Sequence, residues 1–378
     1  MSNFSWRIVI IGSVVILMAG VALSAPASPQ KIETLKIGAK APNFNLPGVD
    51  GKRHKLSEFD KANILVIVFT CNHCPTAQAY EERIKQLAAD YKSKGVALVA
   101  VSPNDPQAVR LDELGYSDLS DSLEEMKIRA KDKKFNFPYL YDGDKQNVSQ
   151  SYGPVSTPHV FIFDKQRILR YVGRVDDSEK LDRVKSHDTR NAIEALLAGK
   201  EVSVQTTPTF GCSIKWSDKR GSVKKAFEAW AKEAVTIEPV DPNGVKEIVK
   251  NSSDKLRLIN VWASYCAPCA IEFEDLVNIN RMYRNRNFEM ITINVDDSKT
   301  RGDVLPFLKK QQASCKNYQF NSEDKYKLGE ALDKQWQGPI PYTILVKPDG
   351  EIIYRHVTPI EPLEVKKAIV EYLGRTYK

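Results

Sequence analysis

The sequence of 378 residues carries 55 Lys and Arg against 48 Asp and Glu, a formal net charge of +7, with 42% hydrophobic and 27% charged residues. This composition excludes a collagen-like, low-complexity or largely disordered chain, and the length favours two or three domains. The small net charge without a long basic run gives no support to nucleic-acid binding, and six cysteines are too few for a disulfide-stapled scaffold.

The first 25 residues have the pattern of an export signal. Arg7 precedes the apolar run Ile8–Leu23, and small residues follow between Ser24 and Ala27. These three features together are typical of a secretory signal peptide. The run is shorter than the roughly 20 residues that span a bilayer, although an uncleaved membrane anchor, facing the non-cytoplasmic side, is the alternative. We therefore expect a periplasmic or otherwise exported protein, in a compartment where cysteine pairs can be oxidised.

The next part of the chain predicts a strand, a cysteine pair and a helix in succession. Ile64–Phe69 is a continuous apolar, β-branched run, typical of a strand that is buried on both faces. The motif Cys71-Asn72-His73-Cys74 follows it. Apolar residues between Ala77 and Tyr91 then recur at helical spacing, and Val96–Val101 predicts another strand.

The remainder of this first unit contains an insertion and a hairpin. Residues 103–155 form the insertion, in which Leu123–Lys133 is predicted to be helical. Pro158–Phe163 and Ile168–Val172 then predict two strands that turn at Asp164–Arg167.

The same order of elements returns later in the chain. Leu256–Ala263 predicts a strand, the motif Cys266-Ala267-Pro268-Cys269 follows, and apolar residues from Ile271 to Tyr283 predict a helix. Phe288–Val295 predicts the next strand. A second late hairpin is predicted to begin at Ile340 and to end at His356, and a helix is predicted over Leu363–Leu373.

One structural plan is therefore used twice. We expect a first domain over residues 36–200, a turn-rich linker over 201–223 and a second domain over 224–378. The predicted fold class is α/β, with two tandem domains that each have a central mixed β-sheet flanked by helices.

The two cysteine pairs carry the predicted chemistry. Two cysteines three positions apart at the start of a helix lie one turn apart, and the first stays near the free N–H groups of the helix terminus, where a thiolate is stabilised. A thiolate attacks a disulfide, and the second cysteine resolves the mixed disulfide that forms. The alternatives are a zinc site, which needs four ligands where each unit offers two cysteines, and an inert structural disulfide, which restrains so short a loop little.

The second unit resembles the TlpA-like thiol-disulfide oxidoreductases of the thioredoxin superfamily. The resemblance covers roughly residues 225–378 and is carried by the segment LRLINVWASYCAPCAIEFEDL over 256–276. It implies that Ile340-Pro341 contains the family's cis-proline, whose loop faces the cysteines. Asn260 stands where thioredoxin itself has a buried aspartate, so the proton acceptor for Cys269 is open. Glu272 is a candidate, and an exposed helix carboxylate is the alternative.

The first unit resembles the alkyl hydroperoxide reductase and thiol-specific antioxidant, or peroxiredoxin-like, branch of the same superfamily. The resemblance covers roughly residues 36–200 and rests on Ile37–Leu46, Asp50-Gly51-Lys52 and Leu56–Phe59. It implies a cis-proline at Thr157-Pro158. Around Cys74 the peroxiredoxin pattern asks for a Thr or Ser three residues earlier, and this chain has Cys71 there, so the hydroxyl that contacts the peroxide is missing. A thiol peroxidase centred on Cys74 or Cys71 is therefore the alternative function.

The residues inside and near the pairs suggest different roles for the two units. His73 would stabilise the Cys71 thiolate and make the first pair the stronger oxidant, whereas Pro268 is typical of reducing members; a solvated helix residue is the alternative for His73. His159 could join Cys71 and Cys74 in a copper site, and a copper- or haem-handling module is the non-enzymatic alternative. A hydrogen-bonded histidine at a strand end is favoured, and no metal site is predicted.

Two further cysteines stand alone in the sequence. Cys212 could resolve or relay disulfides from the first unit, or be a buried or unpaired thiol. Cys315 is favoured as a small core residue. The two could also pair with each other, which the sequence does not decide.

These inferences together predict an exported thiol-disulfide oxidoreductase. Cys71 and Cys266 are expected to attack, and Cys74 and Cys269 to resolve. Thr157-Pro158 and Ile340-Pro341 are expected to bind the substrate chain through backbone contacts, as in strand addition. The expected partners are exported thiol or disulfide proteins and a membrane or periplasmic electron donor, with membrane contact only if the N-terminal segment stays uncleaved. No cofactor beyond the two redox-active disulfides, Cys71–Cys74 and Cys266–Cys269, is expected to be required.

Overall fold

The structure, a computed structural model, describes residues 1, 32–297, 301–322 and 324–377. The predicted signal segment, residues 1–25, therefore lies outside the described residues except for Met1. In the described part, no helix is both long enough and apolar enough to cross a membrane.

A five-stranded mixed sheet forms the centre of the first domain, in the order β5-β4-β3-β7-β8. Strand β3 pairs in parallel with β4 and antiparallel with β7. The strands of this domain are β1 (Asn45–Pro47), β2 (Arg53–Lys55), β3 (Ile64–Phe69), β4 (Val96–Ser102), β5 (Tyr139–Tyr141), β6 (Ser156–Thr157), β7 (His159–Phe163), β8 (Leu169–Gly173) and β9 (Cys212–Ser213). Its α-helices are α1 (Pro75–Lys92), α2 (Leu123–Asp132), α3 (Asn147–Tyr152) and α4 (Asp188–Leu197).

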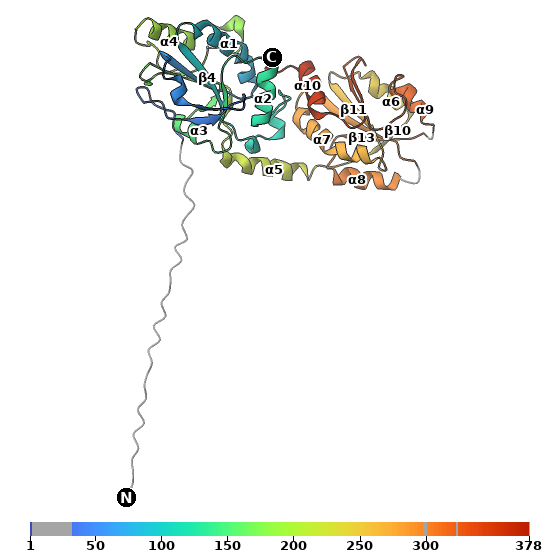
Figure 1. The fold of residues 1–378 in the computed structure, drawn as a ribbon. Helices are drawn as coiled ribbons and strands as arrows, with labels where there is room; N and C mark the ends of the chain where they lie inside the picture. Colours follow the sequence, from blue (N-terminus) through green and yellow to red (C-terminus); the bar gives the residue numbers. More distant parts are fainter. Residues whose placement is uncertain (2–31, 298–300, 323, 378) are drawn as a thin grey trace. The chain divides into compact units, whose positions relative to one another are not determined.

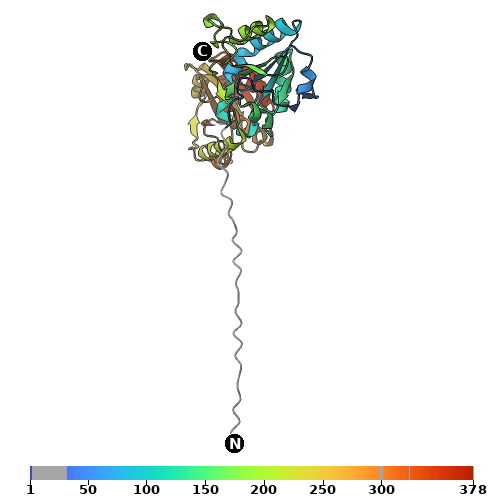
Figure 2. The same ribbon diagram turned by 90° about the vertical axis from the view of Figure 1, so that its left-hand side faces the viewer.

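Alternate side chains of β3 build a separate core on each face of this sheet. Val66 and Val68 pack with residues of α1, α2 and α4, whereas Leu65 and Ile67 pack with residues of α3 and of β1. Figure 1 shows α1 and α4 on one side of β4 and α3 on the other, and Figure 2 shows the same ribbon turned by 90°. Because both faces of β3 are covered, all of its residues are apolar and its sequence shows no polar alternation.

A six-stranded sheet forms the second domain, in the order β10-β13-β12-β11-β14-β15. Its strands are β10 (Glu238–Val240), β11 (Leu256–Trp262), β12 (Phe288–Asn294), β13 (Lys316–Phe320), β14 (Tyr342–Val346) and β15 (Ile352–Val357). The α-helices are α5 (Arg220–Trp230), which precedes the sheet, then α6 (Pro242–Lys250), α7 (Ala267–Tyr283), α8 (Val304–Lys310), α9 (Tyr326–Leu332) and α10 (Pro362–Leu373).

The second sheet is also covered on both faces. Leu256 and Leu258 of β11 pack with residues of α7 and α10. Ile259 and Val261 of the same strand pack with residues of α6 and α9. The predicted fold class is therefore confirmed, since each domain has a mixed sheet flanked by helices. One edge of each sheet is an antiparallel hairpin, β7–β8 in the first domain and β14–β15 in the second.

The segment 201–223, expected to be a linker, packs on the first domain. Strand β9 pairs with β6, with Cys212 opposite Thr157. Earlier in the segment, the Thr207 N–H donates to the Val172 carbonyl at 3.1 Å, so the chain also extends the edge of β8. Ile214 is buried. Cys212 is therefore held against the first domain by contacts on both sides of it.

Residues of the insertion after β4 contact the second domain. Val109 and Leu114 belong to the same apolar cluster as Leu276 of α7. The Arg375 guanidinium forms two hydrogen bonds with the Asp118 carboxylate, at 2.6 and 3.0 Å. Because these contacts join the two domains, the experiments below use the full chain.

Candidate active sites

The second cysteine pair lies where a buried strand leads into a helix. Helix α7 begins at Ala267, and Cys266 is its N-cap residue, whose sulfur accepts a hydrogen bond from the Cys269 N–H at 3.3 Å. The two cysteines form a disulfide with an S–S distance of 2.06 Å. Cys266 is 8% exposed and Cys269 is fully buried, so the first sulfur is the one that a partner reaches. A helix N-terminus also favours a thiolate at Cys266 after reduction.

Glu272 is buried, so the exposed helix carboxylate that the sequence left as the alternative is wrong. Its carboxylate accepts hydrogen bonds from the Asn260 side-chain amide and from the Ile360 N–H, each at 2.8 Å. Burial raises the pKa of Glu272 to about 7, against the effect of these two hydrogen bonds. Glu272 follows Cys269 by one helical turn, a spacing at which side chains are neighbours. It is therefore placed to take the proton of Cys269 near neutral pH.

We expect Glu272→Gln to slow the step in which Cys269 resolves a mixed disulfide by about 10²-fold, the usual size of a general-base effect. In the unchanged protein this step should accelerate as pH rises through about 7, because the ionised carboxylate is the acceptor. Stopped-flow reduction of a model disulfide across pH gives both quantities. Glu274→Gln is the matched control, since Glu274 lies on the same helix but is exposed. If the rate of the resolving step still rises through about pH 7 in Glu272→Gln, Glu272 is not the proton acceptor of Cys269.

The stability of the fold gives a second readout of the same group. The pKa of Glu272 is higher in the fold than its ordinary value of 4.5, so the native state keeps a proton that the unfolded chain releases. The free energy of unfolding should therefore fall as pH rises from about 4.5 to about 7, and Glu272→Gln should remove this part of the slope.

The Ile340-Pro341 peptide bond is cis, as the resemblance implied. Ile340 packs against the apolar cluster that contains Cys266 and Cys269. Within the described residues, no strand pairs with the chain just before Pro341, in contrast to β6 of the first domain. The backbone edge beside this pair is therefore open to an extended partner segment.

The first cysteine pair is placed differently from the second. Helix α1 begins at Pro75, and Cys74 is its N-cap residue, with its sulfur accepting from the Ala77 N–H at 3.4 Å. The expectation that Cys71 opens the helix is therefore wrong. The physical reason is the proline, which is favoured at the first helical position because it has no N–H to leave unpaired. Ala77 occupies the place in α1 that the resolving cysteine occupies in α7.

The electrostatics of the first pair follow this geometry. Burial alone would raise the pKa of Cys74, but hydrogen bonds with Cys212 and Cys71 and the charge of His73 lower that pKa well below its usual range. Burial, with the hydrogen bond to Cys74 and the nearby Asp121 charge, raises the pKa of Cys71 well above it. The structure thus favours Cys74, rather than Cys71, as the thiolate of the first domain.

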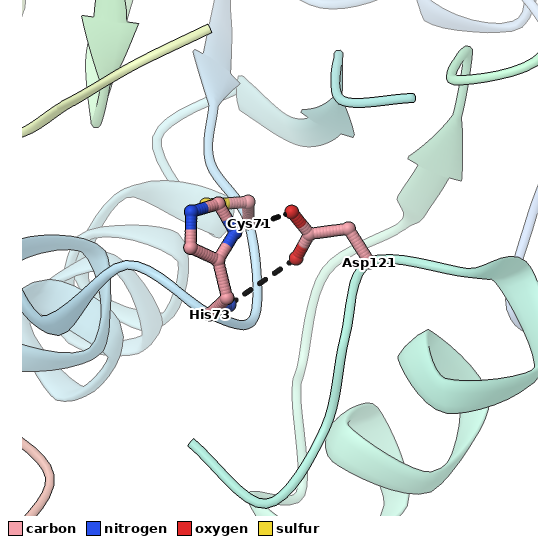
Figure 3. Close-up of side chains that lie close together, drawn as sticks. All are labelled: Cys71, His73 and Asp121. Carbon is pink, nitrogen blue, oxygen red and sulfur yellow. Dashed lines mark hydrogen bonds and ion pairs between the residues drawn. The ribbon is translucent and has the colours of Figure 1, made fainter. Parts of the chain in front are cut away.

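A buried carboxylate, that of Asp121, orients His73 beside Cys71 (Figure 3). Asp121 accepts from His73 Nδ1 at 2.5 Å and from the His73 N–H at 3.2 Å. Although burial disfavours the imidazolium, the charge of Asp121 raises the pKa of His73, and the reverse interaction lowers the pKa of Asp121. His73 Nε2 is buried without a hydrogen-bond partner in the structure. The solvated-residue interpretation of His73 is therefore wrong, and its charge acts on Cys74.

Asp121 could not be found from the sequence. It lies 48 residues after His73, and its carboxylate also accepts from the Asn72 N–H and the Asn104 side chain, both at 2.8 Å. The residues before helix α2 carry no local pattern that singles it out. Only the folding of the insertion against the cysteine loop brings the two groups together.

The possible metal ligands are arranged differently from the copper site considered above. Cys71, His73 and Asp121 have ligand atoms within 4.8 Å of one another, and within the described part of the chain this group does not include His159. The Nδ1 atom of His159 accepts from the Val155 N–H at 3.3 Å, and burial lowers the pKa of His159 to about 4. This is the hydrogen-bonded strand-end histidine that the sequence favoured. Both Asp121 oxygens already accept hydrogen bonds, so we interpret the group as one that positions His73.

The chain around the Thr157-Pro158 bond, which is cis, contacts both sulfurs of the first pair. Thr157 Oγ1 lies 3.2 Å from the Cys71 sulfur, and the Thr157 carbonyl oxygen lies 3.3 Å from the Cys74 sulfur. Cys212 joins this group, because its N–H donates to the Cys74 sulfur at 3.3 Å. Cys315 lies in the second domain, and its thiol donates to Asn317 at 3.3 Å. Cys71, Cys74, Cys212 and Cys315 are all free in the structure, so the disulfide expected between Cys71 and Cys74 is not formed, in contrast to Cys266–Cys269.

The fold, with a cysteine pair where a buried strand leads into a helix in each domain, is thioredoxin-like. Residues 37–172 match the AhpC/TSA family model, and residues 241–371 match the Redoxin family model. The chain therefore carries two tandem regions, the first matching the AhpC/TSA family and the second matching the Redoxin family.

Curated relatives resemble parts of the chain. The thiol-disulfide oxidoreductase ResA of Bacillus subtilis is 26% identical over 113 residues, which are 30% of this chain and 59% of ResA, so less than two thirds of that relative is matched. The thiol:disulfide interchange protein HelX of Rhodobacter capsulatus is 27% identical over 38% of this chain and 75% of HelX. A crystal structure of an uncharacterized conserved protein from Geobacillus kaustophilus is 37% identical, with a TM-score of 0.43, over 48% of this chain and 93% of that one.

Proposed function

We propose that this protein is an exported thiol-disulfide oxidoreductase whose second domain exchanges disulfides with other exported proteins. The observation that carries the proposal is the Cys266–Cys269 disulfide at the N-terminus of α7, with a reachable Cys266 and a buried Cys269. Export is supported by the apolar run Ile8–Leu23 with the small residues after it. The electron donor would be a membrane or periplasmic thiol protein.

The surface next to Cys266 is suited to an extended protein segment. Tyr265 is 59% exposed, Ile271 75% and Tyr326 88%, an unusual exposure for large apolar side chains. The Lys325 ammonium group donates to the Tyr265 hydroxyl at 3.5 Å, which places the start of α9 beside the active site. A cavity of about 400 Å³ adjoins Lys325 and Tyr326 and is also lined by Trp336. Together with the open backbone edge before Pro341, this surface would bind a cysteine-bearing strand.

The full chain with Cys269→Ser should capture its partners as mixed disulfides through Cys266. Without Cys269 the resolving thiol is missing, so the covalent intermediate accumulates instead of turning over. Purification from the exported fraction, followed by non-reducing gels and mass spectrometry of the joined peptides, identifies the sulfur and the partner. N-terminal sequencing of the same sample shows whether residues 1–25 have been removed.

Two variants control this experiment. Cys266→Ser should capture nothing, because Cys269 lies one turn inside α7 and lacks the N-cap position that stabilises a thiolate. Cys315→Ser should behave like the unchanged protein. Capture through Cys269 in the Cys266→Ser protein would reverse the assigned roles. If neither variant of the pair captures a protein, the second domain does not exchange disulfides with proteins and the proposal fails.

Thiol peroxidase activity of the first domain is the second candidate, favoured by the position of Cys74. This residue stands at the helix N-terminus with a lowered pKa, as the attacking cysteine of a peroxidase requires. The thiolate would attack the peroxide O–O bond, giving a sulfenic acid and releasing water or an alcohol, and a second thiol would then displace water. Peroxide consumption that is lost in Cys74→Ser but kept in Cys266→Ser would establish this activity.

A further inference from the structure

The substrate-binding edge of the first domain is already occupied by the chain itself. An extended partner segment was expected to pair with the residue before the cis-proline, Thr157. In the structure, β9 pairs antiparallel with β6 there, and Cys212 is the residue directly opposite Thr157. The position that a partner's cysteine-bearing strand would take is therefore filled by an internal strand that carries a cysteine.

The internal strand is fixed on both sides of Cys212. On the C-terminal side, the Lys215 N–H donates to Asn104 at 2.9 Å, and the Lys215 carbonyl accepts from the Asp105 N–H at 2.9 Å. On the N-terminal side, Gly211 lies so close to Thr157 that a Cβ atom on Gly211 would meet the Thr157 carbonyl oxygen at 2.0 Å. A glycine is needed at this position for the close approach, and its φ of +127° also disfavours other residues.

The sulfur atoms form one cluster. Cys71, Cys74 and Ala77 make up a buried apolar group, and Cys212 packs against it. The Cys212 N–H donates to the Cys74 sulfur at 3.3 Å. The interaction between the two cysteines lowers the pKa of Cys74 and, together with burial, raises that of Cys212. Cys74 has no cysteine one turn further along α1, so its disulfide partner must come from outside the helix. Cys71 and Cys212 are the two thiols within its reach.

We propose that Cys212 is a third redox cysteine, which forms a disulfide with Cys74 and so makes residues 206–215 a built-in substrate of the first domain. The Cys74 thiolate attacks a partner disulfide, forming a mixed disulfide and releasing one partner thiolate. The Cys212 sulfur then attacks the Cys74 sulfur, and its proton passes to the second partner thiolate as that group leaves. Two thiols of the chain are oxidised to one disulfide, and the partner disulfide is reduced to two thiols.

Oxidised glutathione is the probe for this step, applied to the reduced full chain with Cys266→Ser and Cys269→Ser already in place. In the further variant Cys71→Ser, a Cys74–Cys212 disulfide should appear in peptide mass spectra. When Cys212→Ser is added, the Cys74–glutathione adduct should persist at least about tenfold longer, because the neighbouring intramolecular thiol is gone. Two results would overturn the proposal. One is a glutathione adduct that persists, with no Cys74–Cys212 disulfide, in the Cys71→Ser variant that still has Cys212. The other is that oxidised glutathione does not modify Cys74.

A glycine variant tests the role of the strand without changing a sulfur. In the Cys71→Ser background, Gly211→Ala should push residues 206–215 away from Thr157. Formation of the Cys74–Cys212 disulfide should then be at least about fivefold slower, and the Cys74–glutathione adduct should persist for longer. Gly221→Ala is the matched control, since a Cβ atom there meets nothing within 4 Å, and it should leave the rate unchanged. An unchanged rate in Gly211→Ala would show that β9 does not present Cys212 to Cys74. These outcomes concern the first domain alone, so they are independent of partner capture through Cys266.

Discussion

With Cys74→Ser, the first domain should lose its fast-reacting thiol, whereas with Cys71→Ser it should keep one. Cys74 is the N-cap of α1 and has a lowered pKa, and the pKa of Cys71 is raised. The thiolate is the form that is alkylated, and a lowered pKa increases the thiolate fraction at pH 7 while a raised pKa reduces it. At pH 7 we therefore expect alkylation of Cys74 to exceed that of Cys71 by at least about 20-fold.

Iodoacetamide labelling of these two full-length variants, followed by mass spectrometry of the peptide that keeps one cysteine, measures both rates. Both sulfurs are almost fully buried, so access alone does not distinguish them. In urea, where the helix is lost, the two rates should become equal. Faster labelling of Cys71 than of Cys74 in the folded proteins would restore the assignment made from the sequence.

Asp121→Asn should lower the free energy of unfolding by about 3 kcal/mol, because it removes one partner of a fully buried ion pair. It should also move the alkylation profile of Cys74 to higher pH, because His73 loses the charge that raises its pKa. The profile is measured with the Cys71→Ser background, and the stability by urea unfolding.

The pH dependence of this stability loss has a defined window. The pKa of Asp121 is lowered by folding, so its contribution is complete above its ordinary value of 3.8 and is lost as pH falls through the folded pKa. The pKa of His73 is raised, so its contribution is complete below its ordinary value of 6.5 and is lost as pH rises through the folded pKa. The difference between Asp121→Asn and the unchanged protein should be largest between about pH 3.8 and 6.5.

Asp188→Asn separates the two effects of the Asp121 variant. Asp188 is buried in the same domain and pairs with Arg174 at 2.6 Å, at a site that involves none of the cysteines. The Asp188→Asn protein should have a lower free energy of unfolding, while the pH profile of Cys74 alkylation should be unchanged. If Asp121→Asn also leaves that profile in place, His73 does not act on Cys74.

The strands and hairpins that hold the sites could be predicted from the sequence because their causes are local. A strand that is buried on both faces needs an unbroken apolar run, and Ile64–Phe69 is such a run and is β3. The late hairpins follow from short strands around turn residues, and both are present. The repetition of this order along the chain was enough to predict two tandem α/β domains with one cysteine pair each.

The position of the helix start relative to each pair was also present in the sequence, in the prolines. Pro75 follows the first pair and begins α1, which makes the second cysteine, Cys74, the N-cap. Pro268 lies inside the second pair, in the first turn of α7, which makes the first cysteine, Cys266, the N-cap. Because proline is favoured in the first turn of a helix, this difference could have corrected the assignment of Cys71.

The sequence by itself therefore determined the fold class, the two pairs and the cis-proline loops, whose patterns lie within a few neighbouring residues. Tertiary structure decided which groups set the chemistry of the first pair. Asp121 lies 48 residues from His73 in the sequence, and Cys212 lies 138 residues from Cys74. Neither contact can be predicted from a local sequence pattern. Burial, likewise, raises the pKa of Glu272 to about 7, which an exposed carboxylate on the same helix would not show. Burial and nearby charges set these pKa values, and both depend on which distant segments of the chain are in contact. Those contacts are determined only by the tertiary structure.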